Sequence, residues 1–165
     1  MPGLSNRTKR ITITATVMDY ESIRKLIKEN RQQINFGEFG HGPLDDWIDK
    51  AQARLGVKFP PSYIWWLKNY SGGEIYGDEI FSVYGPVYEA IPGGDIIYIY
   101  INELNRKKGF STSDQLVIQE NDQAEMYYFD LNQMDDVGEY PVYVNPAGIK
   151  YADNFLQFLE KKIGE

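Results

Sequence analysis

The chain has 165 residues, 42% of them apolar and 15% aromatic, which suits one domain with a single core and excludes a disordered composition. The absence of cysteine excludes disulfides, thiol nucleophiles and cysteine-ligated zinc. The sequence also has no long apolar run and no signal-peptide core, so we expect a soluble cytoplasmic protein without a membrane partner. The net charge of −7 disfavours direct binding to nucleic acid.

The first predicted elements are a strand and a helix that follow a polar arm. Residues 11–17 alternate apolar and hydroxylated side chains, which indicates an edge strand or an extended tail that pairs only on contact. Asp19 is a suitable N-cap for the next helix, in which Ile23 and Ile27 share a face. We expect this helix to fray at residues 30–33.

A glycine-rich loop at residues 36–42 contains the only histidine, His41. Three glycines suggest a phosphate cradle only weakly, because the G-x-G-x-x-G order and a preceding buried strand are missing. A lone histidine with no cysteine or second histidine is typical of a structural residue. We therefore do not expect catalysis at this loop.

Two amphipathic helices are predicted next. The first carries an apolar stripe from Leu44 to Leu55 at helical spacing and ends at Gly56. The second begins at Pro60-Pro61 and ends at the double glycine Gly72-Gly73. Three aspartates of the first helix could suggest a metal site, but dipole complementarity on a solvated face explains them better: Asp45, Asp46 and Asp49.

The second half of the chain reads mostly as strands. One or two short strands are expected around Gly77, between residues 74 and 84. Residues 95–108 could be a strand by propensity, but the Asp95 cap and the lysines at the end favour a helix. Three further strands and a last helix capped by Asp153 complete an α+β domain, the strands lying at residues 116–118, 126–131 and 140–144.

No motif for catalysis, metal binding or cofactor binding is present. The chain lacks a G-x-S-x-G elbow and a recognisable triad. The run from Asp130 to Asp135 resembles the start of a calcium loop but lacks the ligand and the glycine that should follow. We predict a binding protein with no enzyme activity, cofactor or metal. A small-molecule or metal-dependent enzyme is a third and weaker hypothesis, which carboxylates converging in a pocket would support.

The charge distribution indicates a binding surface. Residues 74–139 carry 14 acidic and 3 basic residues (3 − 14 = −11), a segment that would attract a basic partner. In this segment carboxylates alternate with tyrosines, which give large contact areas with few torsions to restrict. The alternative is that the tyrosines face the core and the acids merely solubilise the domain. The candidate partner-binding residues are Glu74, Tyr76, Asp78, Glu79, Tyr84, Tyr88, Glu89, Glu120, Asp122, Glu125 and Tyr127.

The order of motifs resembles the SMI1/KNR4 family of the SUKH superfamily. A helix ending in Leu55-Gly56 is followed by an apolar-Pro connector, a tyrosine, an aromatic-Leu pair and a Gly-Gly. The matches continue at residues 116–118, 128–131, 138–142 and 155–159. The resemblance covers residues 36–163, so we predict a family domain at 36–165, with an N-terminal arm, strand and helix at 1–35 outside the pattern, in one globular unit.

This resemblance implies a central, mostly antiparallel sheet flanked by helices, and a structural role for the matched residues. Many bacterial members of the family are immunity proteins that bind and block a cognate toxin, often a nuclease, in the cytoplasm. The leading hypothesis is such an antitoxin, and the alternative is a non-catalytic scaffold or regulatory module. The family often has Glu where this chain has Gln52. The signature residues are Leu55, Gly56, Phe59, Pro60, Tyr63, Leu67, Gly72, Gly73, Gly77 and Asp130.

Overall fold

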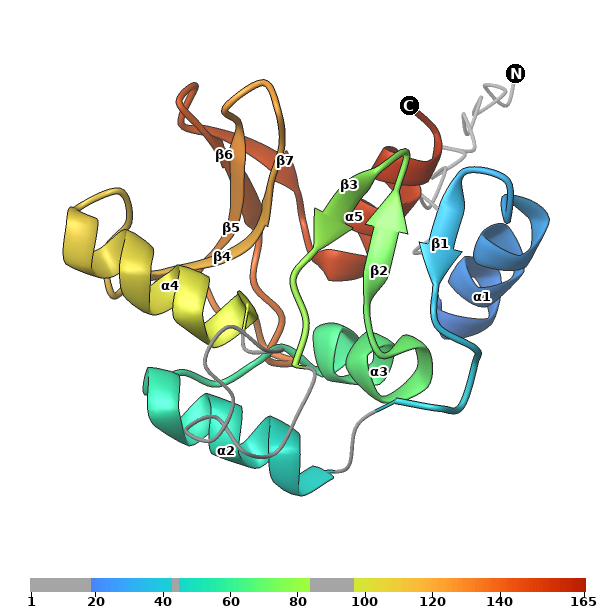
Figure 1. The fold of residues 1–165 in the computed structure, drawn as a ribbon, viewed down its shortest axis with the longest axis horizontal. Helices are drawn as coiled ribbons and strands as arrows, with labels where there is room; N and C mark the ends of the chain where they lie inside the picture. Colours follow the sequence, from blue (N-terminus) through green and yellow to red (C-terminus); the bar gives the residue numbers. More distant parts are fainter. Residues whose placement is uncertain (1–18, 43–44, 84–96) are drawn as a thin grey trace, which may run out of the picture.

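A computed structural model describes residues 19–42, 45–83 and 97–165, with the backbone alone for residues 97–100 (Figure 1). These residues form five helices and a sheet of seven strands. The helices are α1 (Tyr20–Glu29), α2 (Asp45–Leu55), α3 (Pro61–Tyr70), α4 (Ile97–Lys108) and α5 (Phe155–Ile163). The strands are β1 (Ile34–Phe36), β2 (Gly73–Ile75), β3 (Asp78–Ile80), β4 (Gln115–Glu120), β5 (Met126–Asp130), β6 (Val142–Asn145) and β7 (Ile149–Ala152).

The sheet follows chain order from β1 to β7, and every neighbouring pair is antiparallel. This confirms the predicted α+β class with an antiparallel sheet. Strands β3 and β4 share a single register pair, Ile80 with Gln119, and a further hydrogen bond from Phe81 N to Ile118 O. Beyond this point the side chain of Asn102 on α4 takes the place of a strand beside β4. It donates to Val117 O (2.9 Å) and accepts from Val117 N (2.8 Å).

The core is centred on α3. Tyr63, Trp66 and Leu67 of this helix are completely buried, at the spacing of one helical face. The ring of Tyr63 contacts those of Phe129 and Phe155 at 5.8 and 5.2 Å between centroids, so it joins α3 to the sheet and to α5. Its hydroxyl donates to Phe81 O (2.6 Å), which satisfies the polar group of this buried side chain.

The glycine-rich loop packs on the end of α3. Gly40 N and Gly42 N donate to the carbonyls of Asn69 and Lys68, both at 2.8 Å. These bonds satisfy carbonyls that the end of a helix leaves without an intrahelical partner. A Cβ at Gly42 would lie 2.0 Å from Lys68 O, so the close approach requires glycine here.

Several boundaries differ from the sequence predictions. Strands β1 and β7 were not predicted, and the last helix is capped by Asn154, whose side chain accepts from Gln157 N, and not by Asp153. The helix at residues 97–108 and the Asp19 cap, which accepts from Ser22 N at 2.7 Å, confirm the predictions. The strand expected at residues 11–17 lies outside the described residues.

Candidate partner-binding surface

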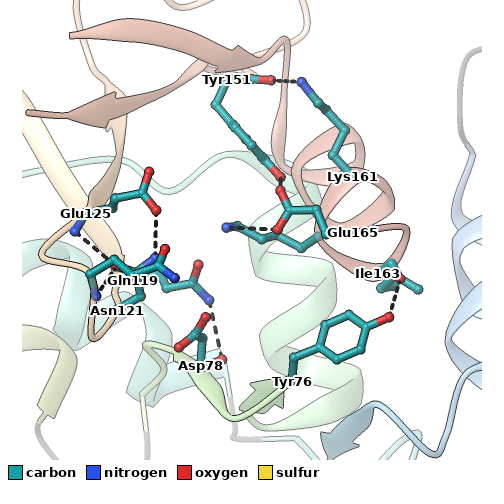
Figure 2. A network of polar contacts seen from close by, with 11 residues as sticks. Tyr76, Asp78, Gln119, Asn121, Glu125, Tyr151, Lys161, Ile163 and Glu165 are labelled. Carbon is teal, nitrogen blue, oxygen red and sulfur yellow. Dashed lines mark hydrogen bonds and ion pairs between the residues drawn. The ribbon is translucent and has the colours of Figure 1, made fainter. Parts of the chain in front are cut away.

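The turns of an antiparallel meander alternate between the two ends of its sheet, which brings the β2–β3, β4–β5 and β6–β7 turns to one end. The last turn of α5 lies at the same end, because the hydroxyl of Tyr76 in the β2–β3 turn reaches Ile163 O (3.3 Å; Figure 2). We call this region the turn end. It consists of residues 76–78, 120–125, 146–148 and 161–165.

Tyr76 is the most prominent side chain of the turn end. It occupies the first position of the two-residue turn between β2 and β3, with φ of 51°, and Gly77 follows with φ of 86°. Both values lie in the left-handed region, which glycine and asparagine adopt far more easily than tyrosine. The side chain is nevertheless 53% exposed, so burial of its ring does not compensate for the strain.

The β4–β5 turn is held by its own side chains. Asn121 Oδ1 accepts from Gln123 N (3.1 Å) and Glu125 N (3.0 Å), and its Nδ2 donates to Glu125 Oε1 (3.0 Å; Figure 2). Such side-chain bonds to the local backbone fix the shape of a turn. Asp122 therefore projects from a rigid tip, where it is exposed.

Within the turn end, one lysine is buried beside two tyrosines. Lys162 Nζ lies 3.8 Å from the ring centroid of Tyr127 and 5.1 Å from that of Tyr151, and it forms an ion pair with Glu165 at 3.6 Å. The hydroxyl of Tyr151 donates to Glu165 Oε1 at 2.5 Å. Burial, and then this contact with Glu165, raise the pKa of Tyr151 well above its ordinary value of 10.0. The hydroxyl therefore stays protonated as a donor.

The structure separates the candidate residues into groups. The turn end contains five of them: Tyr76, Asp78, Glu120, Asp122 and Glu125. Tyr127 is only 4% exposed, with its ring against Lys162, so its surroundings are those of a core residue. Tyr84, Tyr88 and Glu89 lie outside the described residues.

Glu74 and Glu79 form a second location. They lie directly opposite each other in the β2–β3 pair. Because side chains alternate along a strand, Glu79 and Asp78 point to opposite faces of the sheet. Asp78 shares its face with Ile80 and, across the register, with Tyr127, whose ring contacts Phe158 of α5. Glu74 and Glu79 are thus on the face away from α5.

The carboxylates of the turn end differ in how they are engaged. Glu120 accepts from Asn105 Nδ2 (2.6 Å), and Glu125 is held by Asn121. No hydrogen bond or ion pair within the described residues engages the carboxylates of Asp78 and Asp122. These two are therefore available to a partner, while Glu120 and Glu125 add to the negative potential around them.

The family model SUKH_6, described as SMI1-KNR4 cell-wall, matches residues 45–159, more than two thirds of the chain. The chain belongs to the SMI1/KNR4 family of the SUKH superfamily. This confirms the resemblance that the motifs indicated. The match begins after α1 and β1, although Ile23, Ile27 and Ile34 join the common core. The division of the chain at residue 35 stays a prediction.

The SMI1/KNR4 signature residues build the helical layer and its connections. Leu55, Phe59, Tyr63 and Leu67 are buried, while Gly56, Gly72, Gly73 and Gly77 have positive φ. Pro60 is the N-cap of α3, and Asp130 closes the turn after β5 by accepting from Asn132 N (3.0 Å). Gln52 Oε1 accepts from Phe59 N (2.8 Å), an acceptor role that a glutamate would also fill.

No group of three or more Asp, Glu or His side chains within residues 19–42, 45–83 and 97–165 is arranged to hold a metal ion. No helix in these ranges is long and apolar enough to cross a bilayer.

The burial of Lys162 and of Glu139 was not predicted from the sequence. Lys162 follows Phe155 and Phe158 at helical spacing, so its place in an apolar stripe of α5 could have indicated burial. Glu139 is buried against α3, and nothing in its local sequence indicates that contact.

Proposed function

We propose that this protein is an immunity protein that binds a basic toxin domain of the nuclease class and blocks it by occlusion, in the cytoplasm of the cell that makes the toxin. The observation that carries the proposal is the turn end, which contains the exposed ring of Tyr76 and the unengaged carboxylates of Asp78 and Asp122. Membership of the SMI1/KNR4 family is consistent with this role.

The electrostatics of the chain suit a partner that binds nucleic acid. A nuclease domain presents Lys and Arg side chains to phosphates, and an acidic surface competes for the same groups. A complementary charge also speeds the encounter of the two proteins, which matters for an inhibitor that must act before the toxin does. Occlusion of this kind requires no catalysis by the immunity protein.

Co-expression with the toxin tests the proposal directly. The immunity role predicts that a neighbouring gene encodes a protein with a C-terminal toxin domain, and this domain is the probe. We expect co-expression to restore growth, and the purified proteins to form a complex in which cleavage of nucleic acid stops. A toxin domain that is neither bound nor inhibited would contradict the proposal.

A scaffold or regulatory module is the second candidate, and the cell-wall wording of the family description favours it. Such a module would bind a non-toxin partner, and no toxin gene would adjoin its own. Genomic context therefore separates the two roles before any binding experiment is made.

A further inference from the structure

We propose that Tyr76 is the anchor of the toxin-binding surface, and that it takes an arginine side chain of the toxin, stacked on its ring and paired with the carboxylate of Asp78. This inference rests on the immunity function proposed above and specifies which partner chemistry the turn end recognises.

The environment of Tyr76 differs from that of Tyr20 and Phe39, two other exposed aromatic residues. The ring of Tyr20 is stacked on Trp65 at 4.7 Å, and that of Phe39 is covered by the guanidinium of Arg24 at 3.8 Å. No ring and no cation within the described residues covers the ring of Tyr76. Its flat face is therefore open to the kind of contact that Arg24 makes with Phe39.

The backbone at Tyr76 favours a different residue. The first position of a turn with two successive positive φ values is best filled by asparagine or glycine. A strained residue persists where the surrounding structure holds it, and such residues concentrate at binding sites. Tyr76 is strained and exposed, and its ring is stacked on nothing within the described residues. These properties suggest that the side chain binds a partner instead of stabilising the fold.

The anchor is also held in place before binding. The Tyr76 hydroxyl donates to Ile163 O (3.3 Å), and Gln119 Nε2 donates to Asp78 O (3.4 Å), so both ends of the turn are attached to neighbouring elements (Figure 2). A rigid aromatic side chain loses little conformational entropy when a partner docks on it.

The local charge selects a cation as the occupant. The C-terminal carbonyls of α5 carry partial negative charge and point to the turn end, where the carboxylates of Asp78 and Glu125 add to it. The nearby lysines are already engaged, Lys162 with Tyr127 and Glu165, and Lys161 with Tyr151 O (2.6 Å). Arginine suits the place better than lysine, because its planar fork stacks on a ring and binds a carboxylate at once.

The test compares Tyr76→Asn with Phe110→Asn for binding to the toxin domain encoded by the adjoining gene. Asparagine suits the turn, so the variant should fold at least as well as the wild type, with an unchanged or higher Tm. We expect its Kd to rise by about 30-fold or more, the loss typical of a hot-spot residue. Phe110 is 62% exposed and follows the lysines that end α4, so it should not attract arginine, and its variant should bind as the wild type does.

The outcomes are distinguishable. If the wild type binds the toxin domain and Tyr76→Asn binds equally tightly, the anchor is overturned while the immunity function stands. If the wild type does not bind, the immunity function falls and the anchor falls with it. Hydrogen exchange of the wild-type complex requires no variant: protection of the backbone amides at residues 76–78 supports the anchor, and unchanged exchange there overturns it.

Discussion

The carboxylate of Glu139 lies at the start of α3, where its two oxygens accept from the backbone N–H of Ser62 (2.8 Å) and from its hydroxyl (2.7 Å). The N-cap residue of this helix is Pro60, whose side chain makes no capping hydrogen bond. Glu139 therefore supplies from 77 residues away the acceptor that a local Ser or Asp would normally provide. The contact joins the α3 layer to the loop between β5 and β6.

Loss of this contact should destabilise the fold. Glu139→Ala leaves a buried N–H and hydroxyl without an acceptor, and we expect it to lower the free energy of unfolding by about 2–3 kcal/mol. Glu139→Gln keeps an oxygen for Ser62 N and an NH₂ group for Ser62 Oγ, so it should cost less than about 1 kcal/mol. Urea unfolding of both variants measures the difference, and equal losses would contradict the capping role.

The same carboxyl should make stability depend on pH. Burial raises the pKa of Glu139 above its ordinary value of 4.5, although the bonds from Ser62 lower it. Because the folded pKa is the higher one, the stabilisation is complete below about pH 4.5 and is lost as pH rises through the raised pKa. We expect the stability of the wild type relative to Glu139→Gln to fall between pH 4.5 and neutral pH, in unfolding curves of both proteins. A constant difference would refute this assignment.

We expect Asn102 to be as important for the stability of the fold as an apolar core residue. It is fully buried, and its amide satisfies both backbone groups of Val117 where β3 no longer pairs with β4. Asn102→Ala leaves those groups without partners, and we expect a loss of roughly 2–4 kcal/mol in the free energy of unfolding. Asn121→Ala offers a comparison, because it removes an amide from an exposed turn and should cost less. Similar losses in thermal or urea unfolding would argue against the strand-like role of Asn102.

The contact between Lys162 and Tyr127 can be measured by a double-mutant cycle. Lys162→Met keeps the apolar stem of the side chain and removes the charge above the Tyr127 ring, while Tyr127→Leu removes the ring. We expect a coupling energy of about 1 kcal/mol, within the range for partly desolvated cation–π pairs. Additive effects in the cycle would mean that packing alone explains the burial of Lys162.

The sequence predicted the elements whose pattern is local. Apolar spacing gave α2, α3 and α5. The helix favoured for residues 95–108 is observed over the described residues 97–108, while its expected cap, Asp95, lies outside them. Strands β1 and β7 have three and four residues, too few for a clear alternation, and they exist because β2 and β6 provide backbone partners. Their prediction would have required the register of the sheet.

The arrangement of the candidate residues could be predicted from the sequence only in part, because it depends on how distant strands and helices pack together. Tyr76, Asp78 and Asp122 were selected from composition, and the meander brings their turns together. The period of two along β3 could have separated Asp78 from Glu79 in advance. The buried positions of Tyr127 and Lys162 depend on the packing of α5 on the sheet, which composition does not encode.

The most direct test of the account reverses two charges at each end of the sheet and measures binding of the toxin domain from the adjoining gene. Asp78→Lys with Asp122→Lys changes the turn end. Asp114→Lys with Asp136→Lys makes the same change in net charge at the opposite end, before β4 and between β5 and β6. We predict that only the first pair slows association about tenfold or more and reduces its dependence on salt. Equal effects of the two pairs, or binding unchanged by the first pair, would contradict the turn end as the binding surface.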